Sequence, residues 1–389
     1  MEKTYLDYAA TTPVDPRVQG AMLPYFSETF GNPSSIHGYG QRAEAAVDFA
    51  REAVAEVLNC RPDEVIFTSC GSEADNLALR GAALAMREKT GANQILTSRL
   101  EHHAVSKTAG QLERHYGFQV GWLEADEFGM VQPGGVEKAI SSRTALVSVM
   151  YANNEIGTVN PVREIAAICR LHGIPFHTDA VQAAAYLPVD VQALGVDLLS
   201  LGGHKFHGPK GVGALHVRKG TPLIPAQTGG GQEFGLRAGT QNVPYIVGFA
   251  EALKLTAEER DQRLAHVCPL RDRIIGRVLE EIADARLTGH PLERLPNHCS
   301  FVFKGVDGNL LLTLLDNSGF ACSSGSACKT GNPEPSDVLT ALGLPREWAL
   351  GSLRVTLGPA TTPAQVDAFL AALPRLVEKA KCFTRDKRR

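Results

Sequence analysis

Residues 196–211 read VDLLSLGGHKFHGPKG, and this stretch predicts a buried strand that runs into a tight turn. The apolar run Val196–Leu201 is typical of a strand inside a sheet, and the glycines after it are typical of a turn. Lys205 lies in that turn, so we expect its amine at the end of a buried strand, where burial disfavours the charged form. A neutral lysine amine can attack a carbonyl carbon and hold an aldehyde. The alternative, which Lys205 alone would favour, is a surface turn in which Lys205 and Lys210 are solvated.

A carboxylate follows another strand-like run, Ile174–His177, and belongs to Asp179. In a layered α/β sheet, ligands gather at the carboxyl ends of the parallel strands. Asp179 and Lys205 are therefore expected at the same edge of a sheet. An aldehyde cofactor that needs a lysine anchor and a carboxylate for its ring nitrogen is pyridoxal 5'-phosphate. The two residues together predict a site for this cofactor.

The fold class follows from the alternation of helical and strand-like patterns before about Leu255. Helices are expected over 47–58, 72–86, 106–116 and 162–171, and strands over 64–68, 93–97, 119–123 and 144–150. This alternation predicts an α/β protein in which crossover helices connect the strands of a parallel sheet.

The pattern changes after Leu255. Helices are expected over 271–285, 309–316 and 364–379, and strands over 300–303 and 352–357. Helices and strands in this arrangement predict a smaller α+β domain. The length of 389 residues also suits two domains.

Composition excludes several classes of function. The chain is 44% hydrophobic and 21% charged, and its formal net charge is -3, so it has no general basic field for nucleic acid or an anionic membrane. No segment has the roughly 18 apolar residues of a membrane span, and the first residues do not resemble a signal peptide. We therefore expect a cytoplasmic protein without direct nucleic-acid or membrane partners.

The eight cysteines show no CxxC pair and no spacing that indicates a zinc site, so neither a metal site nor a disulfide framework is expected. Cys169 lies in an apolar run and is typical of a small core residue. Cys328 differs, because residues 321–333 are small and polar and are typical of a mobile loop. A thiol in such a loop can be exposed and reactive.

Eight short motifs, taken in order, resemble those of the cysteine desulfurases of the nitrogen-fixation and iron–sulfur-cluster type, which belong to the class V aminotransferase group. The motifs are YLDYAATTP (5–13), GNPSSIH (31–37), EHHAV (101–105), NNEIG (153–157), DAVQA (179–183), GHK (203–205), SSGSAC (323–328) and LRVTLG (353–358). The resemblance runs nearly from end to end. It implies a fold-type I homodimer that uses pyridoxal 5'-phosphate, with active sites at the subunit interface.

The resemblance also implies roles at the cofactor ring. Lys205 would hold the cofactor and later move the proton of the substrate's Cα atom. His102 would stack on the ring and assist proton transfer, and Asp179 would keep the ring nitrogen protonated. Gln182 and Asn154 would contact the phenolic oxygen, and Asn154 would also contact the substrate.

The cofactor phosphate needs hydrogen-bond donors. Gly71 and Ser72 open a helix, where backbone N–H groups can face an anion. By resemblance, His204 would add a donor, and Thr240 would reach across from the partner subunit. Gly202 departs from the pattern, since many relatives have serine there, so one phosphate hydrogen bond is in doubt.

The resemblance implies that Arg354 binds the substrate carboxylate, a role that suits the planar guanidinium. Cys328 would attack the sulfur of L-cysteine, which leaves L-alanine and a persulfide on the enzyme. Cys322 is expected to be structural. Residues 14–256 would form the large cofactor domain. Residues 1–13 and 257–389 would form the small domain with the cysteine loop and Arg354.

The implied function is an L-cysteine desulfurase that supplies sulfur, through an acceptor such as an iron–sulfur scaffold protein, for iron–sulfur clusters or thiolated cofactors and tRNA. The basic stretch 379–389 would help to dock an acidic acceptor, and a solvated chain end is the alternative. A related lyase or aminotransferase, including a selenocysteine lyase, is a second interpretation. A non-catalytic sulfur-trafficking protein is a third, which the presence of both Lys205 and Cys328 disfavours.

Overall fold

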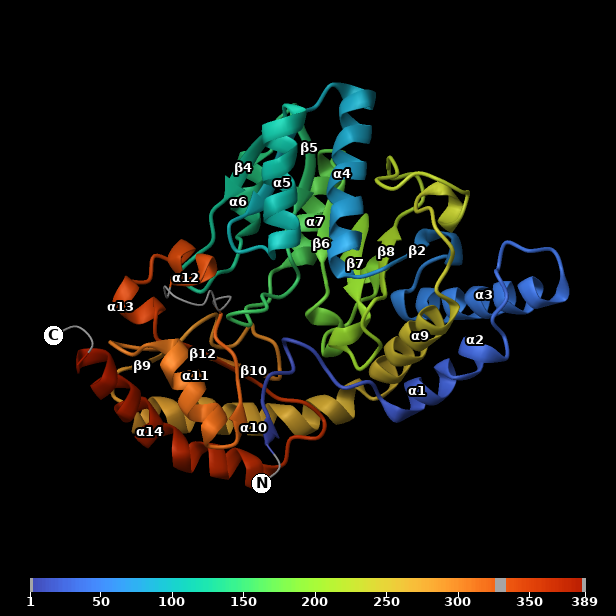
Figure 1. Cartoon of the computed structure of the whole chain (residues 1–389). Coiled ribbons are helices and arrows are strands. Elements are labelled where there is room, and N and C mark those ends of the chain that lie inside the picture. Colours follow the sequence, from blue (N-terminus) through green and yellow to red (C-terminus); the bar gives the residue numbers. More distant parts are fainter. Residues whose placement is uncertain (1–2, 326–333, 387–389) are drawn as a thin grey trace.

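The computed structural model describes residues 3–325 and 334–386, and a large mixed sheet lies at its centre (Figure 1). Within the described residues this sheet has seven strands, in the order β2 (Val65–Thr68), β8 (Gly213–Val217), β7 (Leu198–Gly202), β6 (Phe176–Asp179), β5 (Thr144–Ser148), β3 (Gln94–Ser98) and β4 (Gln119–Leu123). Neighbouring strands are parallel except around β8, which runs antiparallel to β7 and to β2. The expected α/β class with a mostly parallel sheet is confirmed.

Strand β8 is the member of this sheet that the sequence patterns did not predict. Its sequence, GALHV, contains a glycine and a histidine that interrupt the apolar run typical of a buried strand. It follows β7 after the turn that contains Lys205, and Gly202 pairs with Gly213. A short connection joins antiparallel neighbours, whereas parallel neighbours need a crossover. The length of the Lys205 turn therefore explains why β8 departs from the parallel order.

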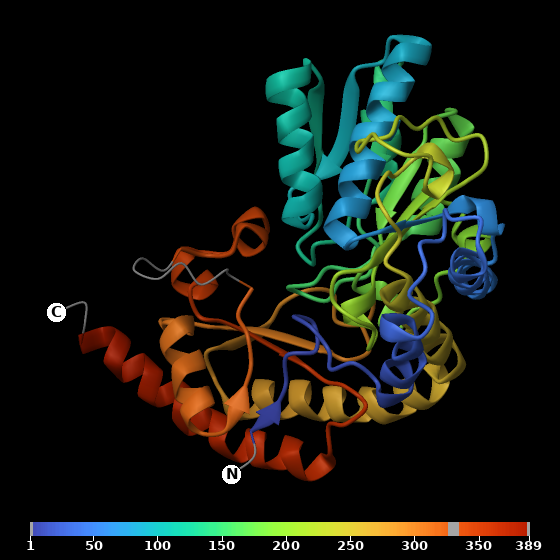
Figure 2. The ribbon, with the colours of Figure 1, turned by 45° about the vertical axis from the view of Figure 1, so that its right-hand side comes forward.

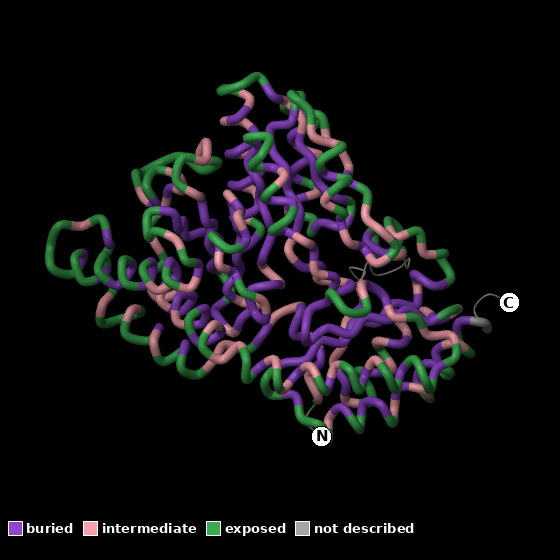
Figure 3. Tube along the Cα trace, turned by 180° about the vertical axis from the view of Figure 1, so that it is seen from behind, coloured by how far each residue is buried: buried purple, intermediate pink, exposed green. Residues whose placement is uncertain are grey.

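Helices cover both faces of the sheet. Residues of α4 (Gly71–Thr90) and α5 (His103–Tyr116) share an apolar core with Ile66, Leu198 and Leu215. The opposite face shares its core with residues of α3 (Gly38–Leu58), α7 (Val162–Leu171) and α9 (Val243–Glu258). Alternate residues of each strand therefore pack into different layers. Figure 3 shows that the buried part of the trace is concentrated in the interior and the exposed part at the periphery.

The C-terminal part contains a smaller antiparallel sheet of β12 (Ser352–Thr356), β10 (His298–Phe303) and β9 (Ala285–Leu287). The long helices α10 (Arg260–Glu281) and α14 (Pro363–Asp386) pack on each other, and α11 (Gly308–Asn317) packs on α14 (Figure 2). The expected helix 271–285 is wrong at both ends: the helix begins at Arg260, and Ala285 instead pairs with Phe303 in the sheet.

The last helix also differs from its expected end at residue 379. It continues to Asp386, because Ala380 is fully buried and the Thr384 hydroxyl accepts a hydrogen bond from the backbone N–H of Asp307 (3.1 Å). The basic stretch 379–389 is therefore helical as far as residue 386. Residues 387–389 lie outside the described part of the chain.

The first residues of the chain pack against the C-terminal part (Figure 2). Strand β1 (Thr4–Tyr5) pairs in parallel with β11 (Phe320–Ala321). The division into a large domain of residues 14–256 and a small domain of the remaining residues stays a prediction.

Shorter helices complete the described chain: α1 (Pro16–Met22), α2 (Pro24–Ser27), α6 (Pro133–Ala139), α8 (Val191–Leu194), α12 (Asp337–Ala341), α13 (Arg346–Ala349) and the 3-10 turns η1 (Pro62–Glu64), η2 (Ala183–Ala185), η3 (Gly203–Lys205) and η4 (Glu233–Gly235). None of the described helices is both long enough and apolar enough to cross a membrane.

Candidate active site

Lys205 ends the 3-10 turn η3, directly after strand β7. Its Nζ atom donates hydrogen bonds to the backbone oxygens of Ala9 (2.6 Å) and Ala10 (2.9 Å). Burial, and then the nearby positive charge of Arg354, lower the pKa of Lys205 to about 8. A substantial fraction of this amine is therefore neutral, and hence nucleophilic, near neutral pH. The solvated surface turn considered from the sequence is wrong for Lys205, which is partly buried, whereas Lys210 is exposed.

Asp179 ends the neighbouring strand β6 and pairs with Ser200 of β7, so the two strand ends meet as expected. Its carboxylate accepts a hydrogen bond from the backbone N–H of Val181 (2.9 Å) and is only 5% exposed. Burial raises its pKa, while the nearby His102 and Lys205 favour its ionised form. The site therefore holds a buried carboxyl group, and His102 and Lys205 offset part of the cost of burying its charge.

Two further buried carboxyl groups surround Asp179. Burial, reinforced by the negative charge of Asp179, raises the pKa of Asp75 well above its usual range, and the pKa of Glu101 is raised mainly by burial as well. Asp75 Oδ1 and Glu101 Oε2 have no hydrogen-bond partner among the described residues. Burial therefore disfavours the ionised form of all three carboxyl groups, and at Asp179 the nearby His102 and Lys205 oppose this effect. Sequence reasoning missed both residues.

His102 and Gln182 lie on two other sides of this group. His102 caps helix α5, and its Nδ1 atom accepts a hydrogen bond from the backbone N–H of Ala104 (3.1 Å). Its ring keeps an exposed face, yet the surrounding protein desolvates it enough to lower its pKa. Gln182 donates from Nε2 to the backbone oxygen of Ala9 (2.9 Å), so Gln182 and Lys205 bind the same carbonyl.

The N-terminus of helix α4 lies beside the turn after β7. A Cβ atom added to Gly71 would lie 2.6 Å from a methyl carbon of Val181, so glycine alone fits there. A Cβ atom on Gly202 would lie 3.5 Å from the backbone nitrogen of Gly71, so these two glycines are neighbours. Ser72 follows on the exposed first turn of the helix. Backbone N–H groups in this position suit an anion.

His204 lies next to this helix end and contacts the N-terminal segment. Its Nδ1 atom is 3.1 Å from the hydroxyl oxygen of Thr11, and its backbone oxygen accepts a hydrogen bond from the backbone N–H of Thr12 (3.0 Å). Burial, with smaller contributions from Lys205 and Lys210, lowers the pKa of His204 to about 4. The ring is therefore neutral, and one of its nitrogens can donate a hydrogen bond.

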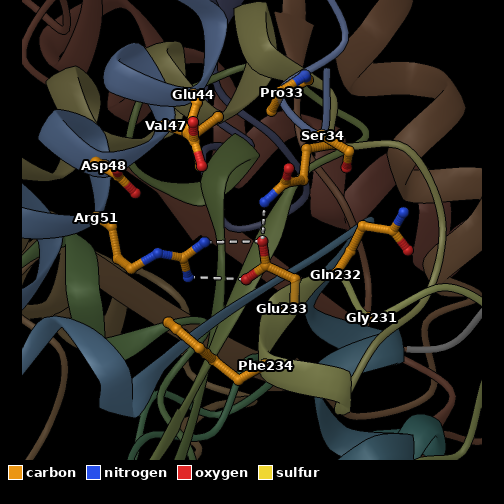
Figure 4. A pocket seen from close by; sticks show the side chains of 11 residues that line it. Pro33, Ser34, Glu44, Val47, Asp48, Arg51, Gly231, Gln232, Glu233 and Phe234 are labelled. Carbon is orange, nitrogen blue, oxygen red and sulfur yellow. Dashed lines mark hydrogen bonds and ion pairs between the residues drawn. The ribbon is translucent and has the colours of Figure 1, made fainter. Parts of the chain in front are cut away.

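Thr240 lies on an exposed part of the loop after η4, and no hydrogen bond between described residues joins it to Lys205. This loop borders the cavity of about 380 Å³ shown in Figure 4, whose lining contains no predicted site residue. Inside it, Glu233 accepts two hydrogen bonds from the buried Arg51 (both 2.8 Å) and one from Gln241 (2.7 Å). The buried ion pair fixes the loop that presents Thr240 outward.

Arg354 lies on strand β12 and is 7% exposed. One Nη atom donates to the backbone oxygen of Asn154 and the other to Asp7, each at 2.9 Å. Asp7 in turn accepts a hydrogen bond from the hydroxyl of Ser323 (2.7 Å). A guanidinium has five N–H donors, and Arg354 Nε has no partner among the described residues. Arg354 is therefore held in place with donors to spare, and sequence reasoning missed Asp7 as its support.

Cys328 lies outside the described residues, so only the residues on either side of its segment can be placed. Glu155 contacts both sides: it accepts a hydrogen bond from the Ser336 hydroxyl, and a Cβ atom on Gly325 would collide with its carboxylate. Burial raises the pKa of Glu155 to about 7. Burial also raises the pKa of Cys322, so that thiol is protonated and unreactive at neutral pH.

The described groups fit pyridoxal 5'-phosphate. Lys205 offers a partly neutral amine, Asp179 a buried carboxyl group, the start of α4 a set of backbone donors, and Arg354 a spare guanidinium donor. The hydrogen bonds that tie Lys205 and Gln182 to Ala9 show that residues 9–12 also belong to the site. The motif YLDYAATTP signalled this segment in the sequence, although no role was predicted for it.

Comparisons with known proteins agree with this geometry. The model of the family "Aminotransferase class-V" matches residues 4–369. A protein of Dictyoglomus turgidum described as "Cysteine desulfurase IscS" is 45% identical over 382 residues, which cover 98% of this chain and 96% of the relative. A solved structure titled "NIFS-LIKE PROTEIN" has a TM-score of 0.89 and 37% identity, over 97% of this chain and all of the other. Another, titled "SspA in complex with cysteine", has a TM-score of 0.79 and 36% identity, over 92% and 99% of the two chains.

Proposed function

The chain belongs to the class V aminotransferase family, and we propose that it is a pyridoxal-phosphate-dependent cysteine desulfurase. Such an enzyme converts L-cysteine to L-alanine, and here the sulfur would stay on Cys328 as a persulfide. The observation that carries the proposal is Lys205 with its pKa of about 8, next to the buried carboxyl group of Asp179 at the ends of adjacent strands. This pair matches what an aldehyde cofactor with a ring nitrogen requires.

When bound, pyridoxal phosphate withdraws electrons from the α-carbon of the substrate and weakens the adjoining bonds. Lys205 would hold the cofactor and then carry the proton of that carbon on Nζ. Asp179 would keep a proton on the ring nitrogen, because an ionised carboxylate in a buried site favours a positive partner. His102 would cover the ring, and Gln182 and Asn154 would contact its phenolic oxygen.

The remaining cofactor contacts would hold the phosphate. Gly71 and Ser72 would donate from the start of α4, and the neutral His204 would add a donor. Gly202 lacks the hydroxyl of a serine, so the backbone N–H of Gly71 beside it would provide a larger part of the hydrogen bonding to the phosphate. Thr240 would reach the phosphate of the partner subunit, which its exposed position supports.

Arg354 would bind the substrate carboxylate with its spare donors, while Asp7 holds the guanidinium in position. The thiolate of Cys328 would then attack the sulfur of L-cysteine. An S–S bond forms, the C–S bond of the substrate breaks, and its electron pair returns to the carbon skeleton, which gains protons to become alanine. The persulfide would pass to an acceptor protein for iron–sulfur clusters or thiolated products.

Exposed apolar side chains support the proposed homodimer. Phe30 is 63% exposed, Ile36 93% and Phe49 71%, and all three lie on helix α3 or the segment before it. Large apolar side chains that are exposed in one chain can become buried in an interface between subunits. Because the loop with Thr240 is also exposed, the same dimer would bring Thr240 to the partner's cofactor. A cytoplasmic location stays part of this proposal.

The proposal is tested by incubating the purified, cofactor-loaded protein with L-cysteine in the absence of any oxo acid, and measuring alanine and, with a thiol reductant present, sulfide. Equal amounts of alanine and sulfide are expected over many turnovers. Dependence on an added oxo acid would instead identify an aminotransferase. A parallel reaction tests the Cys328→Ala variant with L-selenocysteine. If the variant stays active on this substrate, the protein is a selenocysteine lyase.

A further inference from the structure

Three residues that commonly bind metal ions meet at the edge of the large sheet, away from Lys205. Cys60 follows helix α3, Glu64 ends the turn η1, and His216 lies on strand β8. One ligand atom from each residue lies within 4.8 Å of those of the other two. The three come from two separate parts of the chain that the pairing of β2 with β8 brings together, since Val65, the residue after Glu64, pairs with His216.

The environment of His216 gives a second, independent indication of a ligand. The side chain is 0% exposed, and neither ring nitrogen has a hydrogen-bond partner within the described residues. Its strand partners Val65 and Leu199 pack in the core under α3, so His216 shares their face of the sheet and points toward the end of that helix. A buried polar group without a partner destabilises the fold, because it has lost its hydrogen bonds to water. Such a group is normally explained by an ion or a water molecule that binds it.

We propose that Cys60, Glu64 and His216 bind a divalent zinc-like cation. A thiolate, an imidazole and a carboxylate are together typical zinc ligands. The charges of one thiolate and one carboxylate balance a dication, which reduces the cost of burying it. This site is independent of the proposed desulfurase reaction and would fasten the end of α3 to the edge strand β2 and to its neighbour β8.

The geometry allows such a site with small movements. A tetrahedral zinc ion at about 2.0–2.3 Å from its ligands separates them by roughly 3.3–3.8 Å. The three atoms lie within 4.8 Å of one another, so each pair must close in by about 1.5 Å at most. Glu64 already accepts hydrogen bonds from the backbone N–H groups of Lys219 (2.6 Å) and Arg61 (2.9 Å), which orient its carboxylate and leave other lone pairs open.

Cys60 provides both the entry path and the adjustable ligand. It forms no disulfide and is only partly buried, whereas Glu64 and His216 are buried. A cysteine binds a metal ion as its thiolate, so the thiol loses its proton when the sulfur–metal bond forms. One proton is then released to solvent for each ion bound. The cysteine spacing alone gave no sign of this site, because only one cysteine takes part.

The test uses the cofactor-loaded protein with the Cys328→Ala substitution, which removes the other thiol expected to be reactive. After treatment with a chelator, the protein is equilibrated with zinc, freed of loose metal and analysed for zinc per chain. About one zinc per chain is expected in this background. The matched control Cys382→Ser, which removes an exposed thiol on helix α14, should bind the same amount.

Cys60→Ser and His216→Gln should each lose most of this zinc. Cobalt provides a second readout, because a bound thiolate gives an intense charge-transfer band that Cys60→Ser should abolish. Cys60→Ser removes no core side chain, so it keeps the test valid even if His216→Gln does not fold. Zinc content in Cys60→Ser equal to that of the background, or no zinc in the background itself, would overturn the proposal.

Discussion

The replacement Arg354→Lys tests whether the Arg354 guanidinium binds the substrate carboxylate, as proposed. In the structure one Nη atom of Arg354 is bound to Asp7 and the other to the backbone oxygen of Asn154, and Nε is unpaired. A lysine places all its donors on one nitrogen, so it cannot keep the bond to Asp7 and also pair with both oxygens of a carboxylate. One charge-assisted hydrogen bond is worth about 1.5–3 kcal/mol.

We therefore expect Arg354→Lys to lose about 2–3 kcal/mol of transition-state binding, which lowers kcat/KM for L-cysteine by roughly 30- to 150-fold. The assay measures initial rates of alanine formation at low substrate concentration. Cysteamine, which is L-cysteine without its carboxylate, serves as the comparison ligand: the preference of the wild-type protein for L-cysteine binding over cysteamine binding should fall by a similar factor in the variant.

The matched control is Arg273→Lys, which changes an exposed arginine on α10 that pairs with Asp367. Exposed ion pairs contribute little, so its kinetics should stay within about twofold of wild type. If Arg354→Lys keeps the wild-type preference for L-cysteine over cysteamine, the carboxylate binds elsewhere and the assignment of Arg354 is refuted.

Three further predictions concern the amine, the thiols and the chain end. Borohydride reduction should fix the cofactor on Lys205, and a label on another lysine would contradict this. The rate of cofactor capture by the apoprotein should rise about tenfold per pH unit below pH 8 and then level off, because only the neutral amine reacts. A pH-independent rate would contradict the role of this amine. Cys328→Ala should still bind L-cysteine, as seen by absorbance, but release almost no alanine. Cys322→Ala should keep most activity, because the thiol that it removes is protonated in the wild-type protein. Normal turnover by Cys328→Ala would contradict the proposed sulfur capture. Truncation after Asp386 keeps α14 whole and should leave sulfide release unchanged while slowing transfer to an acidic acceptor; equal transfer rates would exclude a docking role for residues 387–389.

The meeting of Asp179 with Lys205 could be predicted from the sequence because it depends on a local rule. Each residue follows an apolar strand, and carboxyl ends of neighbouring parallel strands share an edge. The same rule could not predict β8, because an antiparallel strand after a short turn has no crossover helix to reveal it. The predictions of the helix boundaries at Arg260 and Asp386 were wrong, because tertiary packing, rather than local pattern, decides how far a helix extends.

The support of Arg354 by Asp7 could not be predicted, because 347 residues separate the two positions and no periodicity links them. The buried carboxyl groups of Asp75 and Glu101 were missed for a different reason. Asp75 lies in a helix and Glu101 in a turn before two histidines, positions where an acidic residue is usually solvated. Only the folded structure shows that both are buried, Asp75 on helix α4 and Glu101 where its carboxylate accepts a hydrogen bond from the backbone N–H of Met150 (2.8 Å).

The pairing of β1 with β11 has a consequence for biosynthesis. Thr4 pairs with Phe320, so the first strand of the chain has no partner until more than three hundred further residues have left the ribosome. The segment that follows β1 supplies the Ala9 and Ala10 carbonyls that hold Lys205 and the Asp7 carboxylate that holds Arg354. Contacts between positions so far apart in the chain form late and slowly. A nascent chain can thus build its large sheet early, yet its cofactor pocket is completed only when translation is nearly finished.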